Sequence, residues 1–355
     1  MTDGRARQSR RAVLRNAGIA AAGGMVAASG AGRVAAGASP RRLRSAGNFP
    51  ETPEWNFVFI NHVTTNPFFV PTIYGIEDAS ALLGTTFQWT GSETSDIPEM
   101  VGAFEAAIAG GADGIAIATV DLDAFNDPIQ QALDAGIPVV SYNADAPNAR
   151  MSYVGQDLFG SGVAMGQRIV ELVGEGKVGL FIATPGQLNI QPRIDGAIQA
   201  IEESGANIEY EEIETSAELP EELNRIEAWY LGNTDAAGMF AVDAGSTQAV
   251  GQVVQQQSAR DNGLTGAGGY DLLEMTVQLV ADGVLDFTID QQPYLQGFLP
   301  VQYLYLSKLS GGVVLPPETN TGLVFLNSET AGLFLETSSR FEGDSEEQQI
   351  VEPAG

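Results

Sequence analysis

Short apolar runs alternate with longer segments of helical periodicity along most of this chain, and this alternation is the strongest constraint on its fold. The runs are continuous rather than interrupted by polar residues, which is typical of strands covered on both faces. The predicted strands are Phe57–Asn61, Thr86–Thr90, Gly114–Ala118, Pro138–Tyr142, Val178–Ala183, Ile208–Ile213, Ala237–Val242, Ala267–Tyr270 and Asp286–Asp290. The predicted helices are Phe69–Leu83, Ile97–Ala109, Phe125–Ala135, Ser161–Val173, Gln191–Glu203, Glu221–Tyr230, Thr247–Ala259, Leu273–Ala281 and Gln296–Leu309. Strict alternation of strand and helix predicts right-handed crossovers and parallel sheets.

The number of these units predicts two domains. About five strand–helix units precede Met151–Gly160, where a short strand at Tyr153–Gly155 leads into a glycine-rich helix start, and four or five units follow. The fold class is therefore α/β, with two doubly wound parallel-sheet domains and a cleft between them. In such sheets ligands bind beyond the carboxyl ends of the strands.

The N-terminus has the layout of an export signal. Arg10 and Arg11 precede an uncharged run rich in Ala and Gly from Asn16 to Gly32, which is too short and too glycine-rich for a membrane span. We predict a twin-arginine signal over residues 1–38 and a flexible lead-in over 39–54; the alternative is a basic, disordered N-terminus. An exported protein is extracellular or associated with the cell surface, away from ATP, NAD and chromosomal DNA.

Charge is distributed very unevenly along the chain. The chain carries 17 basic and 45 acidic residues, and nine of the basic residues lie in the first 47 positions with only Asp3 opposing them. The remainder has eight basic and 44 acidic residues, a formal charge of −36 with two lysines. This surface repels nucleic acid and indicates an extremely halophilic source, because multimolar salt reduces the Debye length to about 3 Å or less and screens the repulsion. An ordinary acidic protein is the alternative.

The residue inventory also limits the chemistry. The chain has no cysteine and a single histidine, His62, so it lacks disulfides, a lipid-attachment cysteine and the ligands of a zinc site. A Ser-His-Asp triad would have to use His62, and no G-x-S-x-G segment exists. We expect no catalytic residues, no metal and no cofactor. Gly160–Gly166 resembles a nucleotide-binding fingerprint but follows the interdomain crossover, so we attribute it to close packing of a helix on a sheet.

Polar residues follow the predicted strands at their carboxyl ends, together with two adjacent aromatic residues. This set comprises His62, Asn66, Phe68, Phe69, Asn143, Asp145, Arg193, Asp243, Asp271 and Gln291. Carboxylates and amides accept from hydroxyl groups, arginine donates, and an aromatic face covers the C–H side of a sugar ring. Turn or helix-capping roles are the alternative for each Asx residue. His62 could have a structural role or lie at the rim of the site instead of bonding the ligand, and Arg193 could pair with Asp195 instead.

Several segments, in this order and spacing, carry a family resemblance. They are Asn66-Pro67-Phe68-Phe69, Gly111–Ile115, Ala135–Val140, Gly269-Tyr270-Asp271 and Thr288–Pro293. From Asn56 to Phe325 the chain resembles the type I periplasmic substrate-binding proteins of ABC transporters, in the ribose-binding branch.

The resemblance implies roles for most of these side chains. Asn66 would bond a sugar hydroxyl, Phe68 and Phe69 would pack on the ring, Asp271 would accept from two hydroxyls, and Gln291 would contact the ligand at the hinge. Asn143 and Asp243 stand where the ribose binders have an aspartate and an asparagine, respectively.

Departures from the family pattern argue against ribose itself. Ala144 and Gln191 stand where ribose binders have arginines, His62 replaces a small hydroxyl residue, and Asp145 adds an acceptor. A neutral or amino-bearing polyol fits better than an anionic sugar.

The resemblance also implies three crossings between the domains. An N-terminal lobe would comprise residues 55–153 and 292–314, and a C-terminal lobe residues 154–291 and 315–335. A frayed acidic tail would follow over 336–355.

The function expected from these observations is that of a receptor for a sugar or sugar-like polyol. Two lobes close around the ligand by hinge bending, and a monomer delivers it to the permease of an ABC importer. One alternative is a sensor that presents the ligand to a chemoreceptor or signalling kinase. The effector domain of a transcription regulator and an exported carbohydrate-active enzyme are weaker alternatives.

Overall fold

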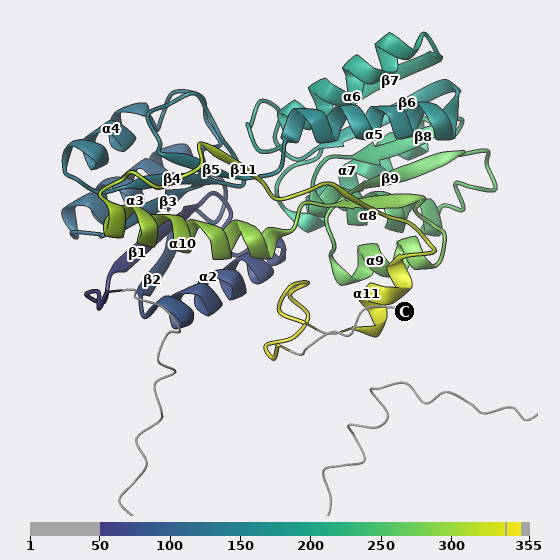
Figure 1. The fold of residues 1–355 in the computed structure, drawn as a ribbon. Helices are drawn as coiled ribbons and strands as arrows, with labels where there is room; N and C mark the ends of the chain where they lie inside the picture. Colours follow the sequence, from purple (N-terminus) through teal and green to yellow (C-terminus); the bar gives the residue numbers. More distant parts are fainter. Residues whose placement is uncertain (1–49, 338, 349–355) are drawn as a thin grey trace, which may run out of the picture. The chain divides into compact units, whose positions relative to one another are not determined.

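The computed structural model describes residues 50–337 and 339–348, and the predicted signal over 1–38 lies outside this part of the chain. Within it, two sheets belong to one compact unit that begins at Pro53 (Figure 1). The first sheet has the order β11-β5-β4-β3-β1-β2, and all its strands are parallel. Its strands are β1 (Asn56–Asn61), β2 (Thr86–Gly91), β3 (Gly114–Ile117), β4 (Val139–Tyr142), β5 (Ser152–Gly155) and β11 (Glu318–Asn320).

The first sheet is covered by helices on both faces, as a parallel sheet must be to bury its apolar strands. The elements are the 3₁₀ helix η1 (Pro67–Phe69), α2 (Val70–Leu83), α3 (Ile97–Ala109), α4 (Asn126–Asp134) and α10 (Pro293–Ser310). α10 packs along α2, and α3 contacts α4. Phe57, Phe59, Ile115 and Val139 are fully buried in the core of this lobe.

The second sheet repeats the plan with one antiparallel edge. Its order is β12-β10-β9-β8-β6-β7, and only β12 runs antiparallel to its neighbour. Its strands are β6 (Glu175–Ile182), β7 (Asn207–Glu214), β8 (Gly238–Ala241), β9 (Gly266–Tyr270), β10 (Phe287–Asp290) and β12 (Val324–Leu326). Its helices are α5 (Leu158–Val173), α6 (Gln191–Ser204), α7 (Leu219–Gly232), α8 (Ala244–Gln256), α9 (Glu274–Ala281) and α11 (Ala331–Glu336). The predicted fold class, two doubly wound α/β domains, is confirmed.

The chain passes between the two sheets after β5, after β10 and after β11. Two details differ from the predicted boundaries, which placed 154–291 and 315–335 in the second lobe. β5 continues to Gly155 in the first sheet, and β11 pairs in parallel with β5. β11 covers the backbone groups that β5 would otherwise leave unpaired at the sheet edge. Its sequence, Glu-Thr-Asn, has no apolar run that could reveal it.

Glycines of α5 allow this helix to approach α6 closely. A Cβ atom on Gly162 would lie 2.2 Å from the carbonyl oxygen of Arg193, and one on Gly166 would lie 2.5 Å from that of Ala197. The Gly160–Gly166 segment therefore serves close packing, as we expected, but its partner is a helix and not the sheet. None of the described helices is long and apolar enough to cross a membrane.

The described part of the predicted acidic tail is packed, which contradicts our expectation of a frayed end. Ser339 is fully buried, and Arg340 forms ion pairs with Glu77 and Asp78 of α2. The ring of Phe341 stands edge-on to Tyr294 of α10, with centroids 4.7 Å apart. α11 itself packs against α9 of the second lobe. The segment after α11 contacts α2 and α10, so the chain returns there to the first lobe. The ion pairs of Arg340 and the ring contact of Phe341 hold this segment against the first lobe, although the residues around them are mostly polar.

Candidate functional site

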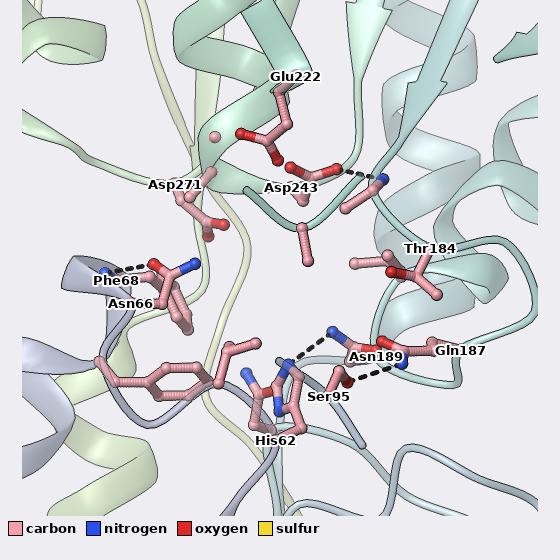
Figure 2. Close-up of a pocket in the computed structure, with 18 of the residues that line it drawn as sticks. His62, Asn66, Phe68, Ser95, Thr184, Gln187, Asn189, Glu222, Asp243 and Asp271 are labelled. Carbon is pink, nitrogen blue, oxygen red and sulfur yellow. Dashed lines mark hydrogen bonds between the residues drawn. The ribbon is translucent and has the colours of Figure 1, made fainter. Parts of the chain in front are cut away.

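A cavity lies at the carboxyl ends of strands from both sheets, with about 570 Å³ of empty space when the open solvent at its mouth is included. Side chains from both lobes point into it (Figure 2). Nine of the ten side chains selected from the sequence line it, namely His62, Asn66, Phe68, Phe69, Asn143, Arg193, Asp243, Asp271 and Gln291. Their contact with a ligand stays a prediction, whereas their convergence on one cavity is a property of the fold.

Asp145 is the exception. It pairs with Arg150, whose Nε lies 2.7 Å from Asp145 Oδ1, and it is absent from the cavity lining. The carboxylate compensates a half-buried guanidinium that also donates to the carbonyl of Pro317. Asp145 therefore holds the loop after β4 against the segment that leads to β11, and we withdraw it from the candidate site.

The loop after β1 provides the aromatic wall. Asn66 caps η1 by accepting from the Phe68 backbone N–H at 2.9 Å, and its amide nitrogen points into the cavity (Figure 2). Phe69 is 2% exposed and packs edge-on to His62 and to Phe68. A buried Phe69 thus supports Phe68, which is only partly buried and lines the open space.

Asp271 is the acceptor at the centre of the second lobe's rim. It follows β9 with a φ of 74°, a left-handed conformation that Asp and Asn adopt more readily than most residues. Gln291 Nε2 donates to its Oδ1 at 2.8 Å, and its carboxylate points into the cavity (Figure 2). Burial raises the pKa of Asp271 to about 7, while nearby Arg193 and the Gln291 hydrogen bond oppose this shift.

A network of amides lies where the crossovers meet the cavity. Asn143 Nδ2 donates to Gln296 Oε1 at 3.1 Å, and Gln296 Nε2 donates to both oxygens of Gln291. Thr321 Oγ1 donates to the Gln291 carbonyl at 2.7 Å. Asn143 Oδ1 is buried and has no donor among the described residues. Since a buried acceptor without a donor is costly, this oxygen is suited to a ligand hydroxyl.

Arg193 is buried to 2% exposure and does not pair with Asp195. Its terminal nitrogens donate to the carbonyl of Val242 at 2.8 Å and to Gln156 Oε1 at 3.1 Å, and its guanidinium lies 4.1 Å from the ring centre of Tyr270. Its Nε has no acceptor among the described residues. One donor of a rigidly held guanidinium is thus available beside the cavity.

The helix start at Asp243 brings a second carboxyl group into the site. Asp243 caps α8, its Oδ1 accepting from Ser246 N at 2.9 Å and its Oδ2 from Ala183 N at 3.0 Å. Glu222 of α7 reaches the same place and is 3% exposed. The sequence pattern does not indicate a buried Glu222, because an exposed first turn of a helix, stabilised by the helix dipole, also contains pairs such as Glu221-Glu222.

Hydrogen bonds across the cavity join the loop after β6 to the first lobe. Gln187 Nε2 donates to Ser95 Oγ at 2.7 Å, Leu188 N to the Val120 carbonyl at 3.0 Å, and Asn189 Nδ2 lies 3.2 Å from His62 Nε2. Burial lowers the pKa of His62 to about 4, so the ring is neutral at pH 7 and Nε2 accepts from the amide. Thr184 lines the cavity from the same loop. Thr184 directly follows the strand predicted over Val178–Ala183, and this position is the sequence signal that could have placed the loop at the cavity.

The lining combines hydrogen-bond acceptors, one guanidinium and an aromatic wall, a combination that suits a small hydroxylated molecule. In the described part of the chain, no three side chains among His, Cys, Asp and Glu are grouped to hold a metal ion.

Comparison with known proteins agrees with this geometry. The chain is 50% identical over 314 residues to the xylose/arabinose-binding protein XylF of Sulfolobus acidocaldarius, covering 84% of this chain and 77% of that protein. An ABC transporter solute-binding protein from Burkholderia graminis, solved with D-arabinose, superposes with a TM-score of 0.74 at 23% identity, covering 79% of this chain and 98% of that one. GanP, a glucose-galactose binding protein from Geobacillus stearothermophilus, gives 0.71 at 24% identity, covering 78% and 99%. These two structures share the fold.

Residues 57–310 match the periplasmic binding protein domain family. A match of this extent, together with the two-lobed architecture and the cavity between the sheets, shows that the chain belongs to the periplasmic binding protein family.

Proposed function

We propose that this protein is a non-catalytic, extracytoplasmic receptor for a neutral pentose, xylose or arabinose, which it delivers to an ABC importer. The observation that carries the proposal is the convergence of buried, incompletely satisfied polar groups beside Phe68. Asn143 Oδ1 and Arg193 Nε lack partners among the described residues, and the carboxylate of Asp271 faces the same space. A hydroxylated ring would satisfy these groups and stack on the phenyl face.

The choice of a pentose rests on the relative from Sulfolobus acidocaldarius, which is named for xylose and arabinose. The cavity supports a neutral ligand, because several carboxyl groups surround a single guanidinium that is already engaged on two sides. An anionic sugar would be repelled by Asp243 and Asp271.

We further propose that the receptor is exported, that it works at high salt and that it delivers its ligand to a permease. Arg10 and Arg11 support export by the twin-arginine pathway, and the charge of −36 after the first 47 residues supports a halophilic source. The family supports partnership with a membrane permease, to which we expect a monomer to deliver its ligand.

The experiment is a thermal-unfolding panel in multimolar KCl with D-xylose, L-arabinose, D-ribose, D-glucose, D-galactose and xylitol. A fitting sugar at about 100 times its dissociation constant should stabilise the protein by about 2.7 kcal/mol. Stabilisation by a hexose alone would contradict the pentose assignment. A panel without any shift would contradict sugar binding.

The Asp271→Asn variant tests the site. It keeps the shape and the left-handed backbone preference but removes an acceptor that is charged above its pKa of about 7, so at pH 8 affinity for the bound sugar should fall at least about tenfold. Asp145→Asn makes the same chemical change outside the cavity and should leave affinity unchanged in calorimetric titration. Equal affinities for all three proteins would remove Asp271 from the site.

A further inference from the structure

Glu222 is a buried carboxyl group that lines the cavity without a basic partner. Neither Glu222 nor Asp243 forms an ion pair with any described residue. Ser246 Oγ lies 3.5 Å from Glu222 Oε1, and Oε2 is buried with no donor among the described residues. Figure 2 shows the Glu222 carboxyl pointing toward Asp243 at the edge of the cavity. An isolated carboxylate in this position would be strongly disfavoured.

The backbone is shaped to admit this carboxyl group. A Cβ atom on Gly245 would lie 1.9 Å from Glu222 Oε2, so a larger residue at the first turn of α8 would displace the carboxyl group from this position. Ser246 completes the enclosure, since its Oγ also lies 2.7 Å from Thr215 Oγ1. Close contact with a helix N-terminus also favours negative charge at the pair.

The hydrogen bonds around Asp243 decide where that charge lies. Both of its carboxylate oxygens accept from backbone N–H groups, of Ser246 and of Ala183, which stabilise the ionised form. Two adjacent buried carboxyl groups cannot both ionise, so Glu222 keeps the proton. Burial and the neighbouring Asp243 raise the pKa of Glu222 to about 10, which agrees with this assignment.

We propose that Glu222 and Asp243 form one hydrogen-bonding unit that shares a single proton and binds one hydroxyl group of the sugar. This inference rests on the proposed function and adds a specificity-determining residue to it. Glu222 donates its proton to Asp243, and its other carboxyl oxygen accepts from the ligand. The unit carries one negative charge in total, which keeps the lining compatible with a neutral ligand.

The experiment compares Glu222→Gln and Glu222→Ala with a matched control, Glu221→Gln. Glu221 is the preceding residue on α7, is half-exposed and pairs with Arg225. An amide is neutral, donates and accepts like a protonated carboxyl group, so Glu222→Gln should bind D-xylose within about threefold of the unsubstituted protein. Glu222→Ala removes the acceptor and leaves Asp243 without its donor, and should bind at least about tenfold more weakly. Glu221→Gln should bind normally.

Monodeoxy analogues of D-xylose distinguish ligand contact from a structural role. For the analogue that lacks the hydroxyl bound by Glu222, Glu222→Ala should cause little further loss, whereas it should weaken the other analogues as it weakens D-xylose. An equal loss for every analogue, an Ala variant with normal affinity, or a Gln variant as weak as the Ala variant would each overturn the inference.

Infrared spectroscopy of the ligand-free protein tests the proton independently of sugar binding. At a pH of about 8.5, above the pKa of about 7 for Asp271 and about 6 for Asp290 but below the pKa of about 10 for Glu222, a carboxylic acid C=O band should be present, be lost in Glu222→Gln and persist in Glu221→Gln. If no sugar binds, the proposed function fails by itself, and this band still decides whether Glu222 carries the proton. The absence of a Glu222-dependent band overturns the inference whatever the sugar panel shows.

Discussion

Asn66 and Asp243 both cap helices and both line the cavity. The side-chain oxygen of Asn66 accepts from the backbone N–H of Phe68 in η1, while its amide nitrogen points into the cavity. Asp243 uses both carboxylate oxygens on backbone N–H groups. The capping and binding interpretations of such residues are thus compatible, because a cap immobilises the side chain that a ligand would meet.

At the same scale, Asp290 at the end of β10 predicts a pH dependence of stability. Its side chain is 9% exposed, its Oδ1 accepts from Gln292 N at 2.7 Å, and burial raises its pKa to about 6. The folded protein therefore binds this proton more tightly than the unfolded chain, so the Asp290 contribution to the unfolding free energy falls as pH rises from about 4 to about 6. Asp290→Asn, which keeps the acceptor, should stabilise the protein by about 1–3 kcal/mol at pH 8 and have little effect at pH 4.

Denaturant unfolding at the two pH values measures this effect. Asp286→Asn is the control, because Asp286 is paired with Arg260 and its neutralisation should not stabilise the protein at pH 8. A stabilisation by Asp290→Asn that is equal at pH 4 and pH 8 would show that the ionisation of Asp290 is not the cause.

At the scale of elements, hydrophobic periodicity was sufficient to predict the type and bounds of a helix or strand where the segment is long or fully buried. The helix predicted over Ile97–Ala109 has those ends in α3, and the strand at Pro138–Tyr142 differs from β4 by one residue. β11 escaped notice because three polar residues carry no periodicity. Its strand conformation comes from pairing with β5, a contact between segments more than 150 residues apart.

The contact between α5 and α6 gives a prediction for Gly162. An added Cβ would meet the backbone of Arg193, which cannot shift without moving α6, so Gly162→Ala should destabilise the protein by about 1–3 kcal/mol. Gly102 in α3 has open space around it, and Gly102→Ala should stabilise by about 0.5–1 kcal/mol through helix propensity. Chemical denaturation of both variants checks the pair, and a neutral Gly162→Ala would mean that the helices separate at little cost.

At the scale of the whole described chain, residues 339–348 follow α11, the last helix of the second lobe, and pack against α2 and α10 of the first lobe. Arg340 lies over the ring of Tyr74 at 4.1 Å and between two carboxylates, and it is 12% exposed at its side chain. The contact joins residues more than 260 positions apart. Its composition is that of a solvated tail, so no local pattern could have indicated it.

Truncation after Thr337 should therefore lower the unfolding free energy by about 1–3 kcal/mol, because it removes these contacts and leaves Glu77 and Asp78 without their basic partner. Truncation after Gln348 keeps Arg340 and Phe341 and should have no effect. Thermal unfolding in multimolar KCl compares the two, and equal melting temperatures would show that the packed segment adds nothing to stability.

Local patterns in the amino-acid sequence were enough to predict two α/β domains, the strongly acidic composition of the chain after its first 47 residues, and the polar side chains that follow the strands. These properties depend on burial and on residues close together in the chain, which periodicity and composition record directly. Folding in three dimensions decided that Glu222 enters the cavity, that Asp145 turns to Arg150, and that the tail packs on α2. Each of those outcomes depends on contacts between segments that are far apart in the sequence, across the cavity or at a sheet edge. Such contacts leave no local pattern in the sequence.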